Sequence, residues 1–298
     1  MRELVKILIF VVVTAAVGCV LAPPLYWLGN TVATHSLFSD LAGFEFHRYF
    51  SRAILVAAVL LLWPLLRTLG IRRWADLGLS PNDARVRHCL LGFGLASVGL
   101  AATAAVLLAV GRAGWRGNIS WDAFPSALLS AVVVALIEES LFRGALLGAL
   151  RRRLSWPWAL ILLSLVFAAL HFLKPPRDVH FDSVSWTSGF VLLPQLFWQY
   201  GDALLLAGGF LTLVVFSLVL GWTVVQTKSL YAAIGMHAGW VFAFKSFREV
   251  ARLRGEPTVW LGDDLLTGLV PVALVAFTGL LVGLLLHKPQ RPLSTERI

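Results

Sequence analysis

The chain has 298 residues, of which 58% are hydrophobic and only 14% are charged, and its mean hydropathy is +0.81. Because a soluble domain carries about 25% charged residues, this composition excludes an ordinary water-soluble protein and requires lipid around the apolar surface. The formal charge of +9 at pH 7 does not indicate a nucleic-acid partner, since the basic residues lie mainly between apolar segments, where they anchor a protein to lipid headgroups.

Eight apolar segments have about the length that a helix needs to cross a membrane, which is about 20 residues. They lie near residues 4–28, 53–70, 89–110, 124–150, 156–173, 203–226, 229–247 and 266–286. A further apolar segment, 186–200, is short and interrupted by Pro194, and it could be a re-entrant or interfacial segment or the start of a long sixth helix. The expected fold is all-α, a polytopic membrane bundle of about eight transmembrane helices that forms a single domain over residues 1–298.

The charges that flank these segments predict the orientation of the bundle. The first segment resembles a signal peptide, but its apolar part is longer than the core of such a peptide, so we expect a retained helix. Lys and Arg are more frequent in the loops on the side of the N-terminus, with Arg151, Arg152 and Arg153 as the strongest marker. We therefore expect a multi-pass protein with both termini inside.

The fourth predicted helix carries three ionisable residues midway along its apolar sequence SALLSAVVVALIEESLFRGALLGAL, namely Glu138, Glu139 and Arg143. At the centre of a transmembrane helix each such residue costs roughly 2.5–3.5 kcal/mol, which pairing or a cavity can reduce. Glu139 and Arg143 are four residues apart and can form an ion pair on one face. Glu138 lies about 100° away from Glu139 around the helix. An ion pair that only fixes helix packing would explain Glu139 and Arg143, but not Glu138.

Two histidines also fall within predicted helices. His171 follows Phe167 by one turn near the end of the fifth helix, and His237 lies well inside the seventh. A single His near a helix end is more often interfacial or hydrogen-bonded than catalytic, so His171 is not informative alone. Because a membrane bundle buries polar groups against one another, we expect both histidines to converge on one site with the three ionisable residues of the fourth helix.

This set of residues fits hydrolysis by an activated water molecule in two ways. A Glu and a His can remove a proton from the water while the second His or the Arg stabilises the developing negative charge. Alternatively, Glu138, His171 and His237 can hold a catalytic zinc ion with water as its fourth ligand. A zinc-dependent mechanism and a metal-free Glu/His mechanism are both compatible with the sequence. The expected partners are the lipid bilayer and a peptide or protein substrate, with no small-molecule cofactor and no nucleic acid.

Three sequence motifs resemble those of the CPBP family, the CAAX proteases and bacteriocin-processing enzymes. EESLFRG at 138–144 resembles the family's EExxxR motif, and FAALH at 167–171 is similar to its FxxxH motif. GWTVVQTKSLYAAIGMHAGW at 221–240 is similar to the third motif, in which a run of small residues leads to a His. Each motif alone is weak, but three in the expected order on apolar segments are fairly specific. The resemblance spans residues 124–242, which we expect to be a CPBP-like catalytic core.

The resemblance implies an intramembrane endopeptidase related to the type II CAAX prenyl proteases. By position, Glu138 activates the attacking water with the help of His171. Glu139 and Arg143 support the site, and His237 helps to bind the oxyanion. Such an enzyme would hydrolyse a peptide bond in a membrane-associated protein or peptide. In bacteria, relatives of this family are linked to bacteriocin maturation, to self-immunity and to the processing of surface or signalling peptides. With this resemblance, the expected location is the inner (plasma) membrane of a bacterium.

One position departs from the family pattern. The third motif is HxxxN or HxxxD, and Val241 stands four residues after His237, without a side-chain donor. Since loss of an oxyanion donor costs about 10²–10³ in rate, the activity could be low, or the indole of Trp240 could replace the missing donor. An alternative function is therefore a catalytically silent membrane scaffold or immunity protein of this fold. A proton-coupled transporter is less favoured, because the sequence shows no inverted repeat and no paired broken helices.

Overall fold

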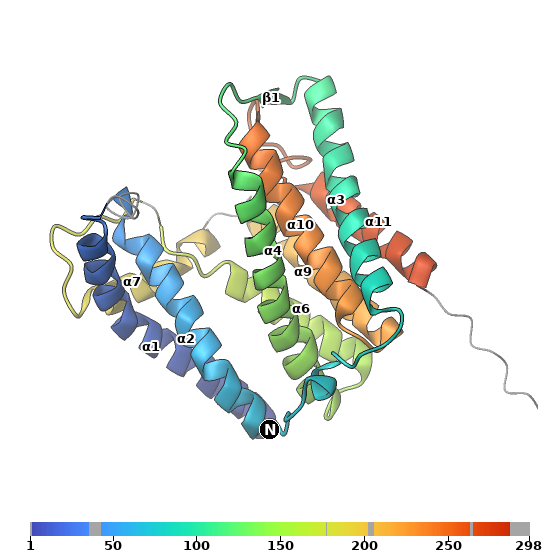
Figure 1. Cartoon of the computed structure of the whole chain (residues 1–298), viewed down its shortest axis with the longest axis horizontal. Helices are drawn as coiled ribbons and strands as arrows, with labels where there is room; N and C mark the ends of the chain where they lie inside the picture. The colour runs from blue at the N-terminus through green and yellow to red at the C-terminus, as the bar shows by residue number, and fades with distance from the viewer. Residues whose placement is uncertain (1, 36–42, 177, 202–205, 263–264, 287–298) are drawn as a thin grey trace, which may run out of the picture.

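Helices form most of the structure, a computed structural model that describes residues 2–35, 43–176, 178–201, 206–262 and 265–286 (Figure 1). In chain order the elements are α1 (Arg2–Val32), α2 (Phe46–Thr68), the 3₁₀ helix η2 (Trp74–Leu77), α3 (Arg85–Ala109), β1 (Ala113–Trp115), α4 (Ala123–Glu139), the π-helix η3 (Ser140–Leu146), α5 (Leu147–Arg151), α6 (Trp156–His171), α7 (Ser188–Leu192), the 3₁₀ helix η4 (Leu193–Gly201), the π-helix η5 (Leu206–Phe210), α9 (Leu211–Thr227), α10 (Tyr231–Val250), β2 (Ala251–Leu253) and α11 (Leu269–Leu286). The predicted fold class, an all-α polytopic bundle, is confirmed.

Among the described residues, six helical stretches are long and apolar enough to cross a membrane: Val5–Val32, Phe46–Thr68, Arg85–Ala109, Ala123–Arg151, Leu206–Thr227 and Leu269–Leu286. Each overlaps one of the eight predicted segments. The other two predicted segments correspond to α6, which has only 16 residues, and to α10. Eleven of the 20 residues of α10 are buried, so protein rather than lipid surrounds much of this helix and it needs no continuous apolar surface. The chain is thus an integral multi-pass membrane protein.

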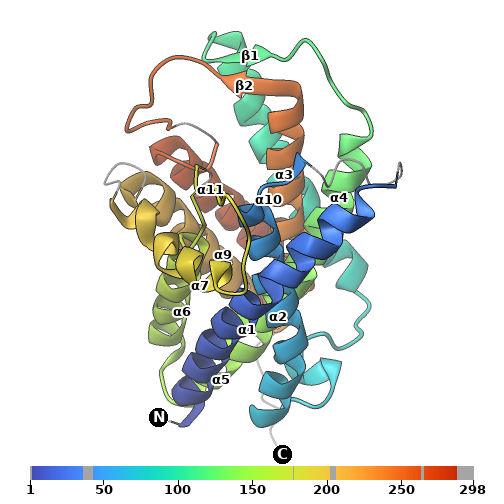
Figure 2. The same cartoon turned by 90° about the vertical axis from the view of Figure 1, so that its left-hand side faces the viewer.

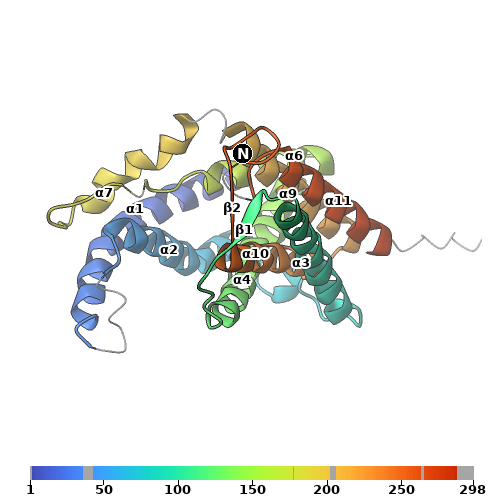
Figure 3. The same ribbon diagram turned by 90° about the horizontal axis from the view of Figure 1, so that it is seen from above.

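The helix α10 lies between α3 and α4 and packs against α3 through glycines (Figures 1 and 3). A Cβ atom added to Gly235 would overlap the backbone carbonyl of Cys89, and one added to Gly239 would overlap that of Phe93. Small residues four apart let two membrane helices approach backbone to backbone. His237 lies midway between the two glycines in sequence and therefore on the opposite side of the helix. The glycine contact thus turns His237 away from α3 and into the bundle.

The buried face of α4 consists of small residues that end on a carboxylate. Ala127, Ala131 and Ala135 are buried at four-residue spacing, and Glu139 continues the same stripe. This spacing keeps side chains on one face of an α-helix. Because α4 contacts α10 extensively, the small side chains allow the two helices to approach closely and bring Glu139 into the interior.

The helices α1, α2 and α7 form a smaller unit beside the bundle (Figures 1 and 2). Their buried side chains gather around Phe50 in a hydrophobic cluster separate from the main core. The C-terminal end of α2 belongs to the main core instead. There, Lys6 Nζ donates to the carbonyl of Thr68 at 2.7 Å, and Arg152 Nη2 donates to that of Leu69 at 3.1 Å. Both cations thus satisfy free carbonyls at the C-terminus of α2, where the smaller unit joins the bundle.

The segment 186–200, which was ambiguous in the sequence, contains α7 and most of η4. Gly189 of α7 lies so close to α1 that an added Cβ atom would overlap the backbone of Cys19. The Cys19 thiol donates to the Gly189 carbonyl at 3.4 Å. The described residues of this segment therefore form two short consecutive helices, of which α7 packs on α1.

A two-stranded antiparallel sheet closes one end of the bundle. It pairs β1 with β2, with Gly114 opposite Arg252, and so joins the loop after α3 to the loop after α10. The sequence predicts only polar loops at these positions, because strands of three residues are too short to show alternation. Exposed tryptophans lie at both ends of the bundle: Trp115, Trp121 and Trp260 at the sheet end, and Trp63, Trp74, Trp156 and Trp158 at the opposite end. Trp186 and Trp198, which are also exposed, lie beside α7 and in η4. Such aromatic belts are typical of the two interfaces of a membrane.

Candidate active site

The five ionisable residues expected to form one site do meet inside the bundle. Glu138 and Glu139 end α4, Arg143 lies in η3, His171 ends α6, and His237 lies in the buried part of α10. The turn that carries Arg143 is π-helical, a rare conformation that occurs frequently at functional sites. The structure therefore brings together every predicted site residue, whereas the role of each stays a prediction.

Glu139 is the centre of a fully buried polar group. Its Oε1 atom accepts hydrogen bonds from Arg143 Nη1 at 2.9 Å and from His237 Nδ1 at 2.8 Å, and neither Glu139 nor Arg143 has exposed side-chain surface. Arg143 also donates through Nη2 to the backbone carbonyl of Ser217 at 3.3 Å, and its guanidinium lies 4.6 Å from the centre of the Phe167 ring. The ion pair expected from the four-residue spacing is thus formed. It ties η3 to α6, α9 and α10 and orients the imidazole of His237.

Glu138 faces two imidazoles rather than a cation. Its Oε2 atom lies 3.5 Å from His171 Nε2 and 3.8 Å from His237 Nε2, and it has no hydrogen-bond partner among the described residues. The side chains of Glu138 and His171 keep 25% and 26% of their surface exposed, whereas that of His237 keeps 4%. Of the two consecutive glutamates, Glu138 is therefore the one with exposed side-chain surface, although its Oε2 atom is itself buried between the two imidazoles.

The other nitrogen of each imidazole is already hydrogen-bonded. His171 Nδ1 lies 2.9 Å from the Phe167 carbonyl, which can only accept, so we assign the proton to Nδ1. His237 Nδ1 faces the carboxylate of Glu139 and is assigned a proton for the same reason. In the neutral rings both Nε2 atoms then carry lone pairs, and these point into the same region as Glu138 Oε2. Three acceptors grouped in this way require a proton, a cation or a proton-donating molecule between them.

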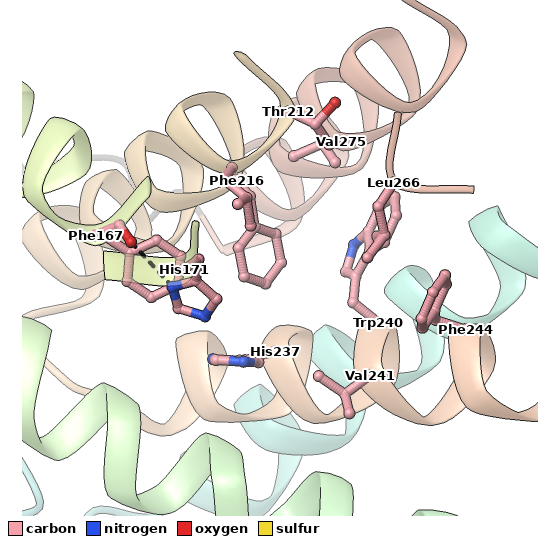
Figure 4. A pocket seen from close by; sticks show the side chains of 11 residues that line it. Phe167, His171, Thr212, Phe216, His237, Trp240, Val241, Phe244, Leu266 and Val275 are labelled. Atoms are coloured by element: carbon pink, nitrogen blue, oxygen red, sulfur yellow. Dashed lines mark hydrogen bonds between the residues drawn. The ribbon is translucent and has the colours of Figure 1, made fainter. Parts of the chain in front are cut away.

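A cavity of about 130 Å³ opens beside the two histidines (Figure 4). The Phe216 ring lies between His237 and Trp240 and is roughly perpendicular to both, with centroid distances of 5.2 and 6.2 Å. Val241 lines the same cavity, and the Trp240 indole Nε1 is buried without a hydrogen-bond partner among the described residues. The walls are otherwise largely apolar, so the cavity suits an apolar substrate side chain.

Sequence reasoning missed most of the walls of this cavity. Phe216 on α9 and Val275 on α11 are apolar residues in apolar helices, and nothing in the sequence distinguishes them from lipid-facing neighbours. The contact of Ser217 with Arg143 was missed as well, because it uses a backbone carbonyl that every residue possesses. Only tertiary structure shows which apolar positions surround the site.

The donor set fits zinc in its chemistry but not in its arrangement. Two imidazoles and a carboxylate are the ligands of some catalytic zinc sites, and there too the second nitrogen of each imidazole is hydrogen-bonded. In the part of the chain that the structure describes, however, no group of three or more His, Cys, Asp or Glu side chains is placed to hold a metal ion. We therefore derive no catalytic step through a metal.

Comparison with known protein families matches the central part of the chain to one family. Residues 120–243 match the family described as Rce1-like, type II CAAX prenyl endopeptidase. The match supports membership of the CPBP family, which the three sequence motifs indicated, and it suggests a CAAX-type intramembrane protease activity. Such an enzyme works in a lipid bilayer on a peptide substrate. Comparisons with curated proteins and with solved structures gave no match.

Proposed function

We propose that this CPBP-family protein is an intramembrane endopeptidase that hydrolyses a peptide bond in a membrane-associated protein or peptide, with a water molecule activated by Glu138 and His171. The observation that carries the proposal is the convergence of Glu138 Oε2, His171 Nε2 and His237 Nε2, each of which is an acceptor when both rings are neutral. A proton on His237 Nε2 and a water molecule that donates to Glu138 Oε2 and His171 Nε2 together satisfy the three atoms. A water oriented in this way beside an apolar cavity is in a position to attack a substrate carbonyl.

In this mechanism Glu138 and His171 form the general base. Glu138 is the carboxylate without an ion pair to an Arg, and His171 lies 3.5 Å from it with an unprotonated nitrogen. As the water oxygen bonds to the carbonyl carbon, one water proton passes to this pair. The same proton then moves to the nitrogen of the departing amine as the C–N bond breaks. The second water proton leaves the new carboxyl group as it ionises and is taken up by the amine, so the products are a carboxylate and an ammonium group.

His237 stabilises the oxyanion of the tetrahedral intermediate. To donate from Nε2 while Nδ1 remains bonded to Glu139, the ring must carry both protons. The Glu139 carboxylate, 2.8 Å away, holds the ring in that orientation, as the Asp does in a Ser-His-Asp triad. Arg143 in turn balances the charge of Glu139.

The oxyanion needs a second donor, and position 241 does not supply one. Val241 occupies the place at which the family motif has Asn or Asp. We assign the role to the indole of Trp240, whose Nε1 is buried beside the same cavity without a partner among the described residues. One such donor contributes about 10²–10³ in rate, so the identity of this group affects the activity strongly.

A zinc-dependent version of this reaction would use Glu138, His171 and His237 as ligands, and a chelator separates the two versions. Purified protein is titrated with a chelator, and zinc is then added back. Unchanged cleavage supports the metal-free mechanism, whereas loss followed by recovery with zinc supports the metal-dependent one. In a bacterium the protein would lie in the inner (plasma) membrane, where its substrate would be a peptide or protein without a prenyl group.

Single replacements of Glu138, His171 and His237 by Ala test the proposal in cells. The cleavage profile of membrane proteins is compared among the three variants, the wild type and a strain that lacks the protein. We expect each variant to match the strain without the protein. If all three match the wild type while that strain differs, the peptidase proposal fails. The alternative, a catalytically silent scaffold or immunity protein, which Val241 favours, would then stand.

A further inference from the structure

The sheet end of the bundle holds a second, polar cavity that the peptidase mechanism does not use. It measures about 290 Å³ and lies between the first turns of α4 and the last turns of α10. Its polar lining consists of one amine, one carboxylate and three hydroxyl groups: Lys245, Glu249, Ser126, Ser130 and Ser246. Ser130 precedes Glu138 by eight residues, about 12 Å along α4, so this cavity is separate from the candidate active site.

An apolar groove of about 350 Å³ adjoins the polar cavity and shares Phe124 and Ser246 with it. The groove is lined mainly by Leu, Ala and Phe side chains of α3 and α10. The exposed Trp115 lines one end of the groove, and the exposed Trp121 stacks on Phe124 with a centroid distance of 5.7 Å. Because exposed tryptophans occupy the headgroup level of a membrane, the polar cavity lies at that level beside an apolar surface for hydrocarbon chains.

The two charged groups of the cavity retain binding capacity. Lys245 Nζ donates to Ser130 Oγ, and an ammonium has two further protons. Glu249 Oε1 accepts from the Ser120 backbone N–H at 2.9 Å, and a carboxylate has room for several more donors. In the described residues the two groups thus bind separate partners rather than each other. Ser246 Oγ is buried and has no hydrogen-bond partner there.

We infer that this cavity binds the headgroup of a zwitterionic phospholipid with a primary ammonium group, of the phosphatidylethanolamine class. Its phosphate accepts hydrogen bonds from Lys245 and Ser246, its ammonium donates to Glu249, and an acyl chain follows the adjoining groove. Charge complementarity selects this headgroup. A phosphatidylglycerol has no cation for Glu249, and the quaternary ammonium of a phosphatidylcholine has no proton to donate.

Lipid titration of the purified full-length protein tests the inference. Phosphatidylethanolamine, phosphatidylglycerol and phosphatidylcholine with identical acyl chains are added to protein in detergent, and bound lipid is counted by native mass spectrometry. We expect phosphatidylethanolamine to bind roughly tenfold more tightly than the other two, the equivalent of one charge-assisted hydrogen bond. Soluble glycerophosphoethanolamine, which lacks acyl chains, should bind much more weakly because it cannot use the groove. Equal affinity for the three lipids would overturn the inference.

Two variants and two matched controls assign the binding to this cavity. Glu249→Gln should remove the preference for phosphatidylethanolamine over phosphatidylglycerol, and Lys245→Gln should weaken the binding of all three lipids. Glu256→Gln and Lys228→Asn change exposed residues outside the cavity and should keep the preference; Asn suits the left-handed backbone of Lys228. Thermal unfolding without added lipid identifies any variant that is misfolded. If a variant is misfolded, the affinities of the wild-type protein for the three lipids decide the inference. A preference that survives in folded Glu249→Gln would also overturn the inference.

Discussion

His237 donates from Nδ1 to Oε1 of Glu139 at 2.8 Å, across 98 positions of the sequence. The same carboxylate oxygen accepts from Arg143, so one buried group both balances the guanidinium and orients the imidazole. Glu138, the preceding residue, faces two imidazole nitrogens and no guanidinium at ion-pair distance. Two consecutive glutamates thus have different environments, and we assign a supporting role to Glu139 and a chemical role to Glu138.

Removal of one partner of the buried ion pair should destabilise the protein more than removal of both. Arg143→Met leaves Glu139 charged and without its cation, which is expected to cost about 3–5 kcal/mol in the free energy of unfolding. The double variant Glu139→Gln/Arg143→Met leaves no buried charge at this position and should lose less. Denaturant unfolding in detergent measures both. Equal losses in the single and double variants would show that the pair is not coupled in this way.

Glu138 and His171 should act as a unit in catalysis. Glu138→Gln and His171→Asn are each expected to lower the rate by at least about 10²-fold, because each removes part of the general base. The double variant should be no slower than the slower single variant, since residues that act together have non-additive effects. Cleavage rates of the purified variants measure this. Effects that multiply would assign independent roles to the two residues.

An Asn at position 241 should raise the rate of peptide hydrolysis in a Trp240→Phe background, in which the second oxyanion donor is missing. Val241→Asn supplies the side-chain donor of the family motif, and a donor of this kind contributes up to about 10²–10³ in rate. With Trp240 present the gain should be much smaller. Val241→Leu in the same background keeps the position apolar and is the matched control, which should not raise the rate. A Trp240→Phe protein whose rate Val241→Asn leaves unchanged would contradict an oxyanion site beside position 241.

Trp240→Phe tests the second donor directly. It removes the indole N–H while keeping an aromatic ring in the cavity, so we expect a lower kcat with little change in KM. In the Val241→Asn background the same replacement should have a smaller effect, because the new amide supplies a donor. A change confined to KM would assign Trp240 to substrate binding instead.

The glycine contact between α3 and α10 should be necessary for stability. Gly235→Ala places a Cβ atom against the Cys89 carbonyl, where only backbone can yield, and overpacking of this kind costs typically about 1–3 kcal/mol. Gly94→Ala on α3 is the control, because an added Cβ atom there meets nothing within 4 Å. Unfolding in detergent compares the two. A Gly235→Ala protein as stable as the control would rule out the close contact.

The site residues could be predicted from the sequence because each is a polar group in an apolar helix. A charged side chain in such a helix is too costly to lie against lipid, so Glu138, Glu139 and Arg143 had to face the interior. The pairing of Glu139 with Arg143 followed from helix geometry alone. Which imidazole each carboxylate would contact did not follow, since that depends on how α4, α6 and α10 pack.

The rest of the fold depends on contacts that sequence patterns do not record. Eight crossing segments were predicted, yet α10 is largely enclosed by protein and α6 is short, so six described stretches meet the requirements for crossing. The π-helical turn at Arg143 and the sheet of β1 and β2 left no sequence signal either. Gly235 and Gly239 do leave a sequence signal, because small residues at four-residue spacing are typical of close helix packing in membranes.

Hydrolysis in oxygen-18 water tests the central claim, that Glu138 activates a water molecule for peptide hydrolysis, most directly. Wild-type protein and the Glu138→Gln variant are reconstituted in liposomes with a membrane peptide whose cleavage in cells depends on this protein. We predict that the wild type yields a product with oxygen-18 in its new carboxylate and that Glu138→Gln yields almost no product. Cleavage by Glu138→Gln at the wild-type rate, or a product without the label, would contradict the proposed mechanism.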